Sequence, residues 1–341
     1  MSAPGRPKRE PSLGEAAAKR LEGRSSAAPG RPKHESSLGE AAAKRLEGRS
    51  SAAPGRPKHE SSLGEAAAKR LEGRPVNMAG AVVLLDWPAP YVARLRINRP
   101  DKRNAIDYAV RQGLIDYLTQ LQGDSGFRAL VLGGVGGIFS AGGDIPSMVG
   151  LDPAGARTRM RHAHELCRLV AQLRVPVVSA FESASTGAAV GLALLGDEII
   201  MGRGARVLFP FLRLGLAPDW GQLLSLPRRV GLPAARRLLT RDGPVLAAEA
   251  EQLGLADQVC DDDAVMTTAI ERAEVLAALP ALAYGQMKQR LNHPSATLAE
   301  EFDREEDDQA ACLCGPDFRE GYQAFREKRQ PVFLPGRPAR T

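Results

Sequence analysis

Short apolar runs alternate with amphipathic stretches from residue 81 to the C-terminus. Residues 81–87 and 91–99 are rich in β-branched or alternating apolar positions, and Pro88-Ala-Pro90 joins them, so they predict a β-hairpin. Asp107 then precedes a stretch to about residue 122 whose apolar residues fall on one helical face. That pattern predicts a helix with Asp107 as its N-cap.

The remaining pattern continues this alternation. Short apolar runs predict buried strands at 128–134, 175–181 and 197–202. Helices are predicted at about 154–173, 186–196, 220–226 and through most of the chain beyond Pro233. Strands that alternate with helices and precede a helical region predict an α/β domain with a helical C-terminal region, and the 264 residues of 78–341 are enough for one such domain.

The first 77 residues differ, because they repeat with a period of 25 residues. PGRPK begins each copy, at Pro4, Pro29 and Pro54, and SLGEAAAKRLEGR follows it. Each copy holds a Ser-x-x-Glu capping box ahead of a short helix-prone run, but only two leucines as large apolar residues. Short helices without a core are marginal in water, so we expect residues 1–77 to be mostly disordered.

Two roles fit this repeat. It could be a basic tether for an acidic partner, or a dispensable tail that precedes the true start at Met78. The repeat lacks the apolar stretch of a signal peptide, and its regularly spaced glutamates argue against a mitochondrial transit peptide.

The formal net charge of +6 lies in the repeat. Residues 1–77 carry 16 Lys+Arg and 9 Asp+Glu, a net of +7, whereas residues 78–341 carry 46−16=30 basic and 40−9=31 acidic residues, a net of −1. We therefore expect no nucleic-acid partner for the 78–341 domain. Four cysteines and the absence of any long apolar run exclude a disulfide scaffold and a membrane span and predict a cytoplasmic protein.

Four motifs follow one another in the 78–341 domain: INRPDKRNAID (97–107), GIFSAGGDI (137–145), the block 175–231 and DFREGYQAFREKRQPVF (317–333). In this order and spacing they resemble the crotonase superfamily, the enoyl-CoA hydratase/isomerase family. The resemblance implies a spiral of ββα repeats, an acyl-coenzyme A thioester as substrate, and a homotrimer or hexamer formed through the C-terminal helices. It implies no metal, flavin or nicotinamide cofactor.

A thioester enolate needs hydrogen-bond donors aimed at its oxygen, and backbone N–H groups in a glycine-rich turn and at a helix N-terminus can supply them. By resemblance these donors are the N–H groups of Gly143 and Ala188. In the same way, Lys102 and Arg103 match the family's coenzyme A entry segment, where cationic side chains suit phosphates. The other positions expected at the substrate are Ala105, Ala141, Asp144, Ile145, Phe211 and Trp220.

Hydratases of this family use two glutamates to activate a water. Aligned without gaps, the first position falls on Gly191 and the second on Phe211, and neither can transfer a proton. The carboxylate that remains is Asp219, at a position where the family's isomerases carry a single base and a dehalogenase branch carries a nucleophile. Apolar neighbours, expected to be Phe209, Phe211, Leu212 and Trp220, would raise its pKa toward neutrality.

These observations leave three functions open: an acyl-CoA isomerase with Asp219 as base, a hydratase or other crotonase reaction with unconventional residues, and a non-catalytic acyl-CoA-binding homologue tethered by its repeat. Structural roles compete at individual residues. Asp219 and Asp144 could each cap a following helix, and Glu182 could be a second acid or a structural partner. His162 and His164 lie two residues apart on a helix with no third ligand, so no metal site is expected.

Overall fold

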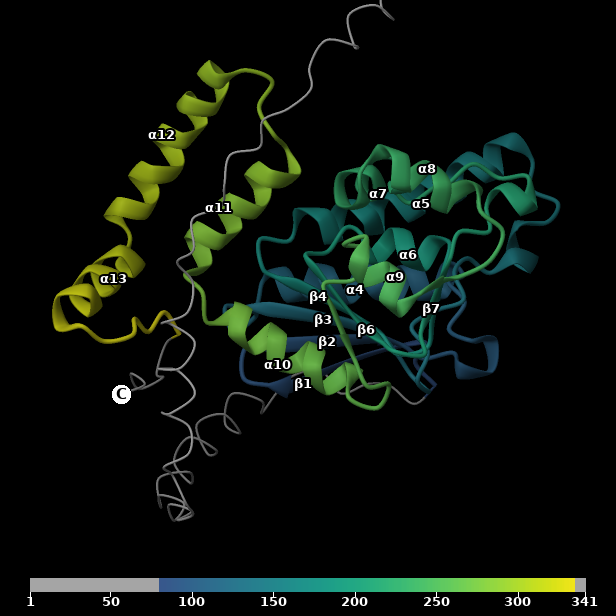
Figure 1. Ribbon diagram of the computed structural model, residues 1–341, viewed down its shortest axis with the longest axis horizontal. Coiled ribbons are helices and arrows are strands. Elements are labelled where there is room, and N and C mark those ends of the chain that lie inside the picture. The colour runs from purple at the N-terminus through teal and green to yellow at the C-terminus, as the bar shows by residue number, and fades with distance from the viewer. Residues whose placement is uncertain (1–79, 335–341) are drawn as a thin grey trace, which may run out of the picture. The chain divides into compact units, whose positions relative to one another are not determined.

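The computed structural model describes residues 80–334, and the predictions for the repeat at 1–77 lie outside the described residues. A six-stranded sheet has the order β1-β2-β3-β4-β6-β9 and a three-stranded sheet the order β5-β7-β8 (Figure 1). The strands of the large sheet are β1 (Val83–Ala89), β2 (Val92–Ile97), β3 (Ala129–Gly134), β4 (Val177–Phe181), β6 (Glu198–Gly202) and β9 (Gln258–Cys260). Those of the small sheet are β5 (Ala184–Thr186), β7 (Arg206–Leu208) and β8 (Val245–Leu246).

The chain winds through the two sheets as a spiral. All neighbours in the large sheet are parallel except β1 and β2, and β5 pairs with β7 in parallel in the small one. β4 is followed by β5 and β6 by β7, so each turn adds one strand to each sheet. Ser140, which follows β3, bridges to Ser185 of β5 and so extends the small sheet by one more segment. The predicted α/β fold with repeated ββα units is confirmed.

Helices separate and cover these strands. Those up to residue 193 are η1 (Pro100–Lys102), α4 (Tyr108–Gln122), η2 (Ile145–Met148), α5 (Pro153–Gln172) and α6 (Ala188–Ala193). The next are η3 (Leu212–Leu214), α7 (Gln222–Val230), α8 (Leu232–Thr240) and α9 (Ala247–Gln252). The region predicted to be mostly helical beyond Pro233 contains α8 and α9 and then α10 (Val265–Ala277), α11 (Ala281–Asn292), α12 (Leu298–Cys314) and α13 (Pro316–Glu327), and the short strands β8 and β9 interrupt it.

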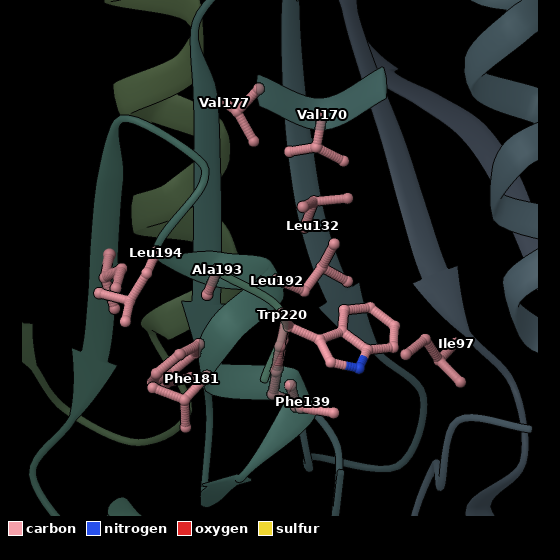
Figure 2. Close-up of a cluster of buried hydrophobic side chains, with 14 of the residues drawn as sticks. Ile97, Leu132, Phe139, Val170, Val177, Phe181, Leu192, Ala193, Leu194 and Trp220 are labelled. Atoms are coloured by element: carbon pink, nitrogen blue, oxygen red, sulfur yellow. The ribbon is translucent and has the colours of Figure 1, made fainter. Parts of the chain in front are cut away.

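Apolar side chains fill both faces of the large sheet. On one face, residues of α4, α5 and α6 pack against the strands in the larger cluster, part of which Figure 2 shows around Leu132, Phe139 and Phe181. On the other face, α10 packs against β2, β3, β4 and β6 (Figure 1). The central strands are buried on both sides, which explains why β3 reads as an uninterrupted apolar run rather than an alternating one.

Several predicted elements keep their boundaries because their caps are local. The Asp107 carboxylate accepts a hydrogen bond from the Val110 N–H at 3.0 Å and begins α4 as predicted. Two predictions were wrong in detail. The hairpin turns at Pro90 and Tyr91, so Pro88 lies inside β1. The helix predicted at 186–196 is shortened to α6, because residues 184–186 pair with β7 and Gly187 breaks the chain direction with φ +52°.

α11 is fastened to the core by a buried ion pair. Lys288 is 3% exposed, and its Nζ lies 2.6 Å from the Asp197 carboxylate and 2.9 Å from the Val175 carbonyl. The same carboxylate accepts from the Val177 N–H at 2.7 Å, so α11 and the start of β4 share one anchor. None of the helices between residues 80 and 334 is both long and apolar enough to cross a bilayer.

Candidate active site

The first predicted oxyanion donor lies in a turn that is held beside Ile106. The Ile106 N–H donates to the Gly142 carbonyl at 2.7 Å, and the Asp144 N–H donates to the Ile106 carbonyl at 3.1 Å. Since Gly142 and Asp144 both bond toward Ile106, the intervening Gly143 N–H is directed away from it. Within residues 80–334 it has no hydrogen-bond acceptor, so this donor is free to meet a ligand.

A close approach of two loops brings the second donor to this turn. A Cβ at Gly142 would lie 2.4 Å from the Thr186 carbonyl oxygen and 3.5 Å from the Ala188 nitrogen, and Gly142 has φ +87°. Only glycine permits this conformation and this contact. The N–H of Ala188, the first residue of α6, has no acceptor among the described residues. The structure thus places Gly143 and Ala188 on neighbouring segments, as oxyanion stabilisation requires.

Asp219 lies in the irregular segment between η3 and α7. Its Oδ1 is buried and has no hydrogen-bond partner within the described part of the chain. Burial raises the pKa of Asp219 from 3.8 to about 6, against an opposing effect of the Arg159 charge. The interpretation of Asp219 as a helix cap is wrong, since the N-cap of α7 is Gly221 and no side chain caps that helix. A carboxylate with this pKa suits a general base near neutral pH.

The aromatic neighbours of Asp219 in the sequence are buried as predicted. Phe209 and Phe211 are each 6% exposed and Trp220 is 4% exposed, with Trp220 inside the larger apolar cluster (Figure 2). Leu212 is 56% exposed, so the prediction that it shields Asp219 was wrong. η3 turns this side chain outward after Phe211, which packs its ring against Gly187, 3.6 Å from the position of a Cβ there.

One charged neighbour was missed by the sequence reasoning. Arg159 of α5 donates to the Ser147 hydroxyl at 3.1 Å, and its other terminal nitrogen lies 3.7 Å from the position of a Cβ on Gly143. Its charge lowers the pKa of Asp219. No sequence signal singled it out, because Arg157, Arg159 and Arg161 alternate along this helix and only the fold decides which one faces the turn.

The two hydratase positions are closed to carboxylates by packing. A Cβ at Gly191 would lie 2.6 Å from the Trp220 Cβ and 3.0 Å from the Gln222 Nε2, so a longer side chain has no room. Phe211 fills the other position with a buried ring. Gln222, the first residue of α7, is fully buried, and its Nε2 donates to the carbonyls of Gly187 and Asp219, both at 3.1 Å.

The remaining substrate-binding predictions fall around the same turn. Lys102 and Arg103 are exposed at the end of η1, and the Arg103 carbonyl accepts from the Ala141 N–H at 2.9 Å. Ala105 is half-buried beside this segment, and Ile145 is 44% exposed at the start of η2. The expected side-chain cap by Asp144 is wrong: it stands at the N-cap of η2 but its carboxylate caps nothing there.

The weaker candidates have different surroundings. Burial raises the pKa of Glu182 against the opposing charges of Arg96 and Arg94, and its Oε2 is also buried with no hydrogen-bond partner among the described residues. His162 accepts at Nδ1 from the Arg111 guanidinium at 3.2 Å, while its Nε2 lies 3.1 Å from the Gln112 amide oxygen, so it is a neutral link between α4 and α5. No group of three potential metal ligands occurs in the described residues.

Comparison with known proteins gives this arrangement its context. The sequence model described as enoyl-CoA hydratase/isomerase matches residues 90–335. The chain belongs to this family. Among its relatives, the 1,2-epoxyphenylacetyl-CoA isomerase of Escherichia coli K12 is 35% identical over 248 residues, which cover 71% of this chain and 94% of the relative. The 2,3-dehydroadipyl-CoA hydratase of the same organism is 29% identical over 243 residues, covering 71% and 94%.

Solved structures agree with the family. The enoyl-CoA hydratase of Bacillus anthracis superimposes with a TM-score of 0.70 at 27% identity, over 74% of this chain and 98% of that one. The resemblance inferred from the motifs is therefore confirmed, and the protein is an enzyme of the enoyl-CoA hydratase/isomerase family. The 35% identical isomerase modestly favours isomerase over hydratase.

Proposed function

We propose that this family member is an acyl-CoA isomerase that works through one carboxylate base, Asp219, and an oxyanion hole formed by the N–H groups of Gly143 and Ala188. The observation that carries the proposal is the buried, unpaired Oδ1 of Asp219, whose carboxyl has a pKa of about 6, at a site where positions 191 and 211 hold no carboxylate. One base is enough for an isomerase, because it can return the proton that it removes.

The reaction would run in two steps. The Asp219 carboxylate removes a proton from the saturated carbon between the thioester carbonyl and the double bond of a 3-enoyl ester, the C–H electrons form a dienolate, and negative charge gathers on the thioester oxygen. The N–H groups of Gly143 and Ala188 stabilise that charge. Protonated Asp219 then delivers the same proton to a different carbon, which regenerates the thioester carbonyl, shifts the double bond and leaves the carboxylate ionised again.

The substrate's coenzyme A would enter beside Lys102 and Arg103, whose exposed cations suit its phosphates. The acyl group would lie against the turn at Gly142, Gly143 and Asp144, which we call the oxyanion turn. The residues proposed to line it are Ala105, Ala141, Asp144, Ile145, Phe211 and Trp220. The chemistry needs no metal, flavin or nicotinamide. We also propose a homotrimer or hexamer, supported by the aromatic side chain of Phe325, which α13 leaves 81% exposed.

The test is a double-bond shift assay. The full chain is incubated with 3-enoyl-CoA esters of several chain lengths, and formation of the conjugated 2-enoyl product is followed by absorbance, with hydration of crotonyl-CoA measured in parallel. We expect a double-bond shift, little hydration, and loss of the shift in Asp219→Asn. Hydration as the main activity would favour the hydratase alternative. Tight thioester binding without turnover of any ester would favour the non-catalytic one.

A further inference from the structure

Gln222 connects the two halves of the proposed catalytic machinery through a single side-chain amide. It is 0% exposed, and its Nε2 donates one hydrogen bond to the Gly187 carbonyl and one to the Asp219 carbonyl, both at 3.1 Å. These two acceptors determine the orientation of the amide, because the flipped amide would place an oxygen against two carbonyl oxygens.

The first acceptor belongs to the peptide group that carries an oxyanion donor. The Gly187 carbonyl and the Ala188 N–H are parts of one planar unit and point in opposite directions. Holding the carbonyl therefore aims the N–H. The Gly187 oxygen accepts from both the Gly191 N–H, at 3.1 Å, and Gln222, while the Gly187 N–H donates to the Leu208 carbonyl at 2.9 Å. The Gly187–Ala188 peptide is thus held from α6 and α7, and the bond to β7 holds the peptide before it.

The second acceptor is the backbone of the base. The Asp219 carbonyl accepts from the Gln222 main-chain N–H and from its side chain, both at 3.1 Å. Asp219 itself lies outside any helix or strand and its carboxylate Oδ1 has no partner among the described residues, so the backbone is where this segment is held. One amide therefore relates the position of the base to that of the Ala188 donor.

The same amide occupies space beside Gly191, where its Nε2 lies 3.0 Å and its Cγ 3.2 Å from the position of a Cβ. Glycine at 191 and glutamine at 222 are complementary: a side chain at 191 would displace the amide. The two side-chain hydrogen bonds of Gln222 are therefore possible only when position 191, where hydratases carry the first glutamate, has no side chain.

We propose that Gln222 is a positioning residue that sets the Ala188 N–H relative to Asp219, and that it also donates to the peptide carbonyl so that the opposite N–H becomes a stronger donor. Hydrogen bonds in series polarise one another, so the second effect follows from the first contact. This inference rests on the proposed function for the identity of the base and the donors.

The test compares Gln222→Met with a matched control. Methionine has a similar length and no donor, so the two side-chain hydrogen bonds disappear while the main-chain bonds to the same carbonyls remain. The control is Gln289→Met, because Gln289 also donates its amide to a main-chain carbonyl, that of Gln172 at 3.2 Å, but on α11. We expect kcat to fall about 10–100-fold in Gln222→Met with KM changed less than about threefold, and the control to match wild type.

A spectroscopic probe separates this proposal from the proposed function. A cinnamoyl-CoA thioester absorbs at longer wavelength when its carbonyl is polarised, and it reports the oxyanion donors without turnover. We expect a red shift on wild type and on Asp219→Asn, and a smaller one on Gln222→Met. An undiminished shift together with unchanged kcat in Gln222→Met would overturn the positioning role. Full activity in Asp219→Asn would refute the base while leaving the probe result on Gln222 valid.

A second variant covers the case in which Gln222→Met does not fold. Gln222→Glu keeps the size and can donate only when its carboxyl is protonated. We expect its kcat, relative to wild type at each pH, to recover as the pH falls, whereas a merely structural loss would lower kcat equally at every pH. A constant ratio across pH would contradict the inference.

Discussion

Two partly buried aspartates of this domain differ in their hydrogen bonding: the carboxylate of Asp197 is paired, whereas that of Asp219 has an oxygen without a partner among the described residues. Asp197 accepts from the Lys288 ammonium at 2.6 Å and from the Val177 N–H at 2.7 Å, and the result is an anchor between α11 and the large sheet. Asp219 keeps an unpaired Oδ1 and a pKa of about 6. Buried polar groups are normally paired because an unpaired one is costly. Glu182 Oε2 is also buried and unpaired, so the proposed role of Asp219 is supported by its raised pKa together with its place beside the Gly187 segment, to which Gln222 links it.

The largest expected effect separates these two carboxylates by activity. Asp219→Asn removes the proposed base and should lower kcat for the double-bond shift about 10³-fold, within the usual range for general acid–base groups. Asp197→Asn should leave kcat within about twofold, because Asp197 faces α11 rather than the oxyanion turn. Steady-state rates at pH 7.5 on folded protein give the comparison. Equal losses in the two variants would remove the distinction.

The next effect separates them by stability. Lys288→Met leaves the Asp197 carboxylate without its cation, and breaking such a pair from one side should reduce the free energy of unfolding by about 3 kcal/mol. Urea denaturation followed by circular dichroism measures the loss. The double variant Lys288→Met/Asp197→Asn removes the orphaned charge as well and should recover part of the stability. No recovery would mean that packing of the lysine stem, not the charge, holds α11.

A smaller effect concerns the electrostatics of Asp219. Arg159 lowers the pKa of this carboxyl, so Arg159→Met should raise it. Because the base acts when ionised, the acid limb of the pH profile of kcat/KM should move upward by about 0.5–1 pH unit. Arg157→Met, two residues away on α5, is the matched control and should leave the limb in place. A downward shift in Arg159→Met would reverse the sign assigned to this charge.

The smallest effect is on the pH dependence of stability. The pKa of Asp219 is about 6 in the folded protein against an ordinary value of 3.8, so the folded state binds the proton more tightly. This group therefore makes stability fall as pH rises from about 4 to about 6, and Asp219→Asn lacks that slope. We expect the variant to be more stable than wild type at pH 7 by about 1–2 kcal/mol, with the difference vanishing near pH 4. Melting temperatures across this range test it.

Much of the fold could be read from the pattern of apolar residues. The strands at 128–134, 175–181 and 197–202 and the Asp107-capped helix appear in the structure within a few residues, because they depend on local capping and on burial of short apolar runs. The strand at 184–186 could not be predicted. It forms by pairing with β7 and with Ser140, and neither partner is local in the sequence.

The candidate site divides in the same way. The resemblance of the motifs to the enoyl-CoA hydratase/isomerase family implied roles for Asp219, Gly143 and Ala188, and the absence of carboxylates at 191 and 211 is a property of the sequence alone. Only the tertiary structure decided that Arg159 faces the oxyanion turn and that Gln222 spans two carbonyls. Residue types and their order are properties of the linear sequence. Burial, and with it the raised pKa of Asp219, arises only when segments distant in the sequence pack together.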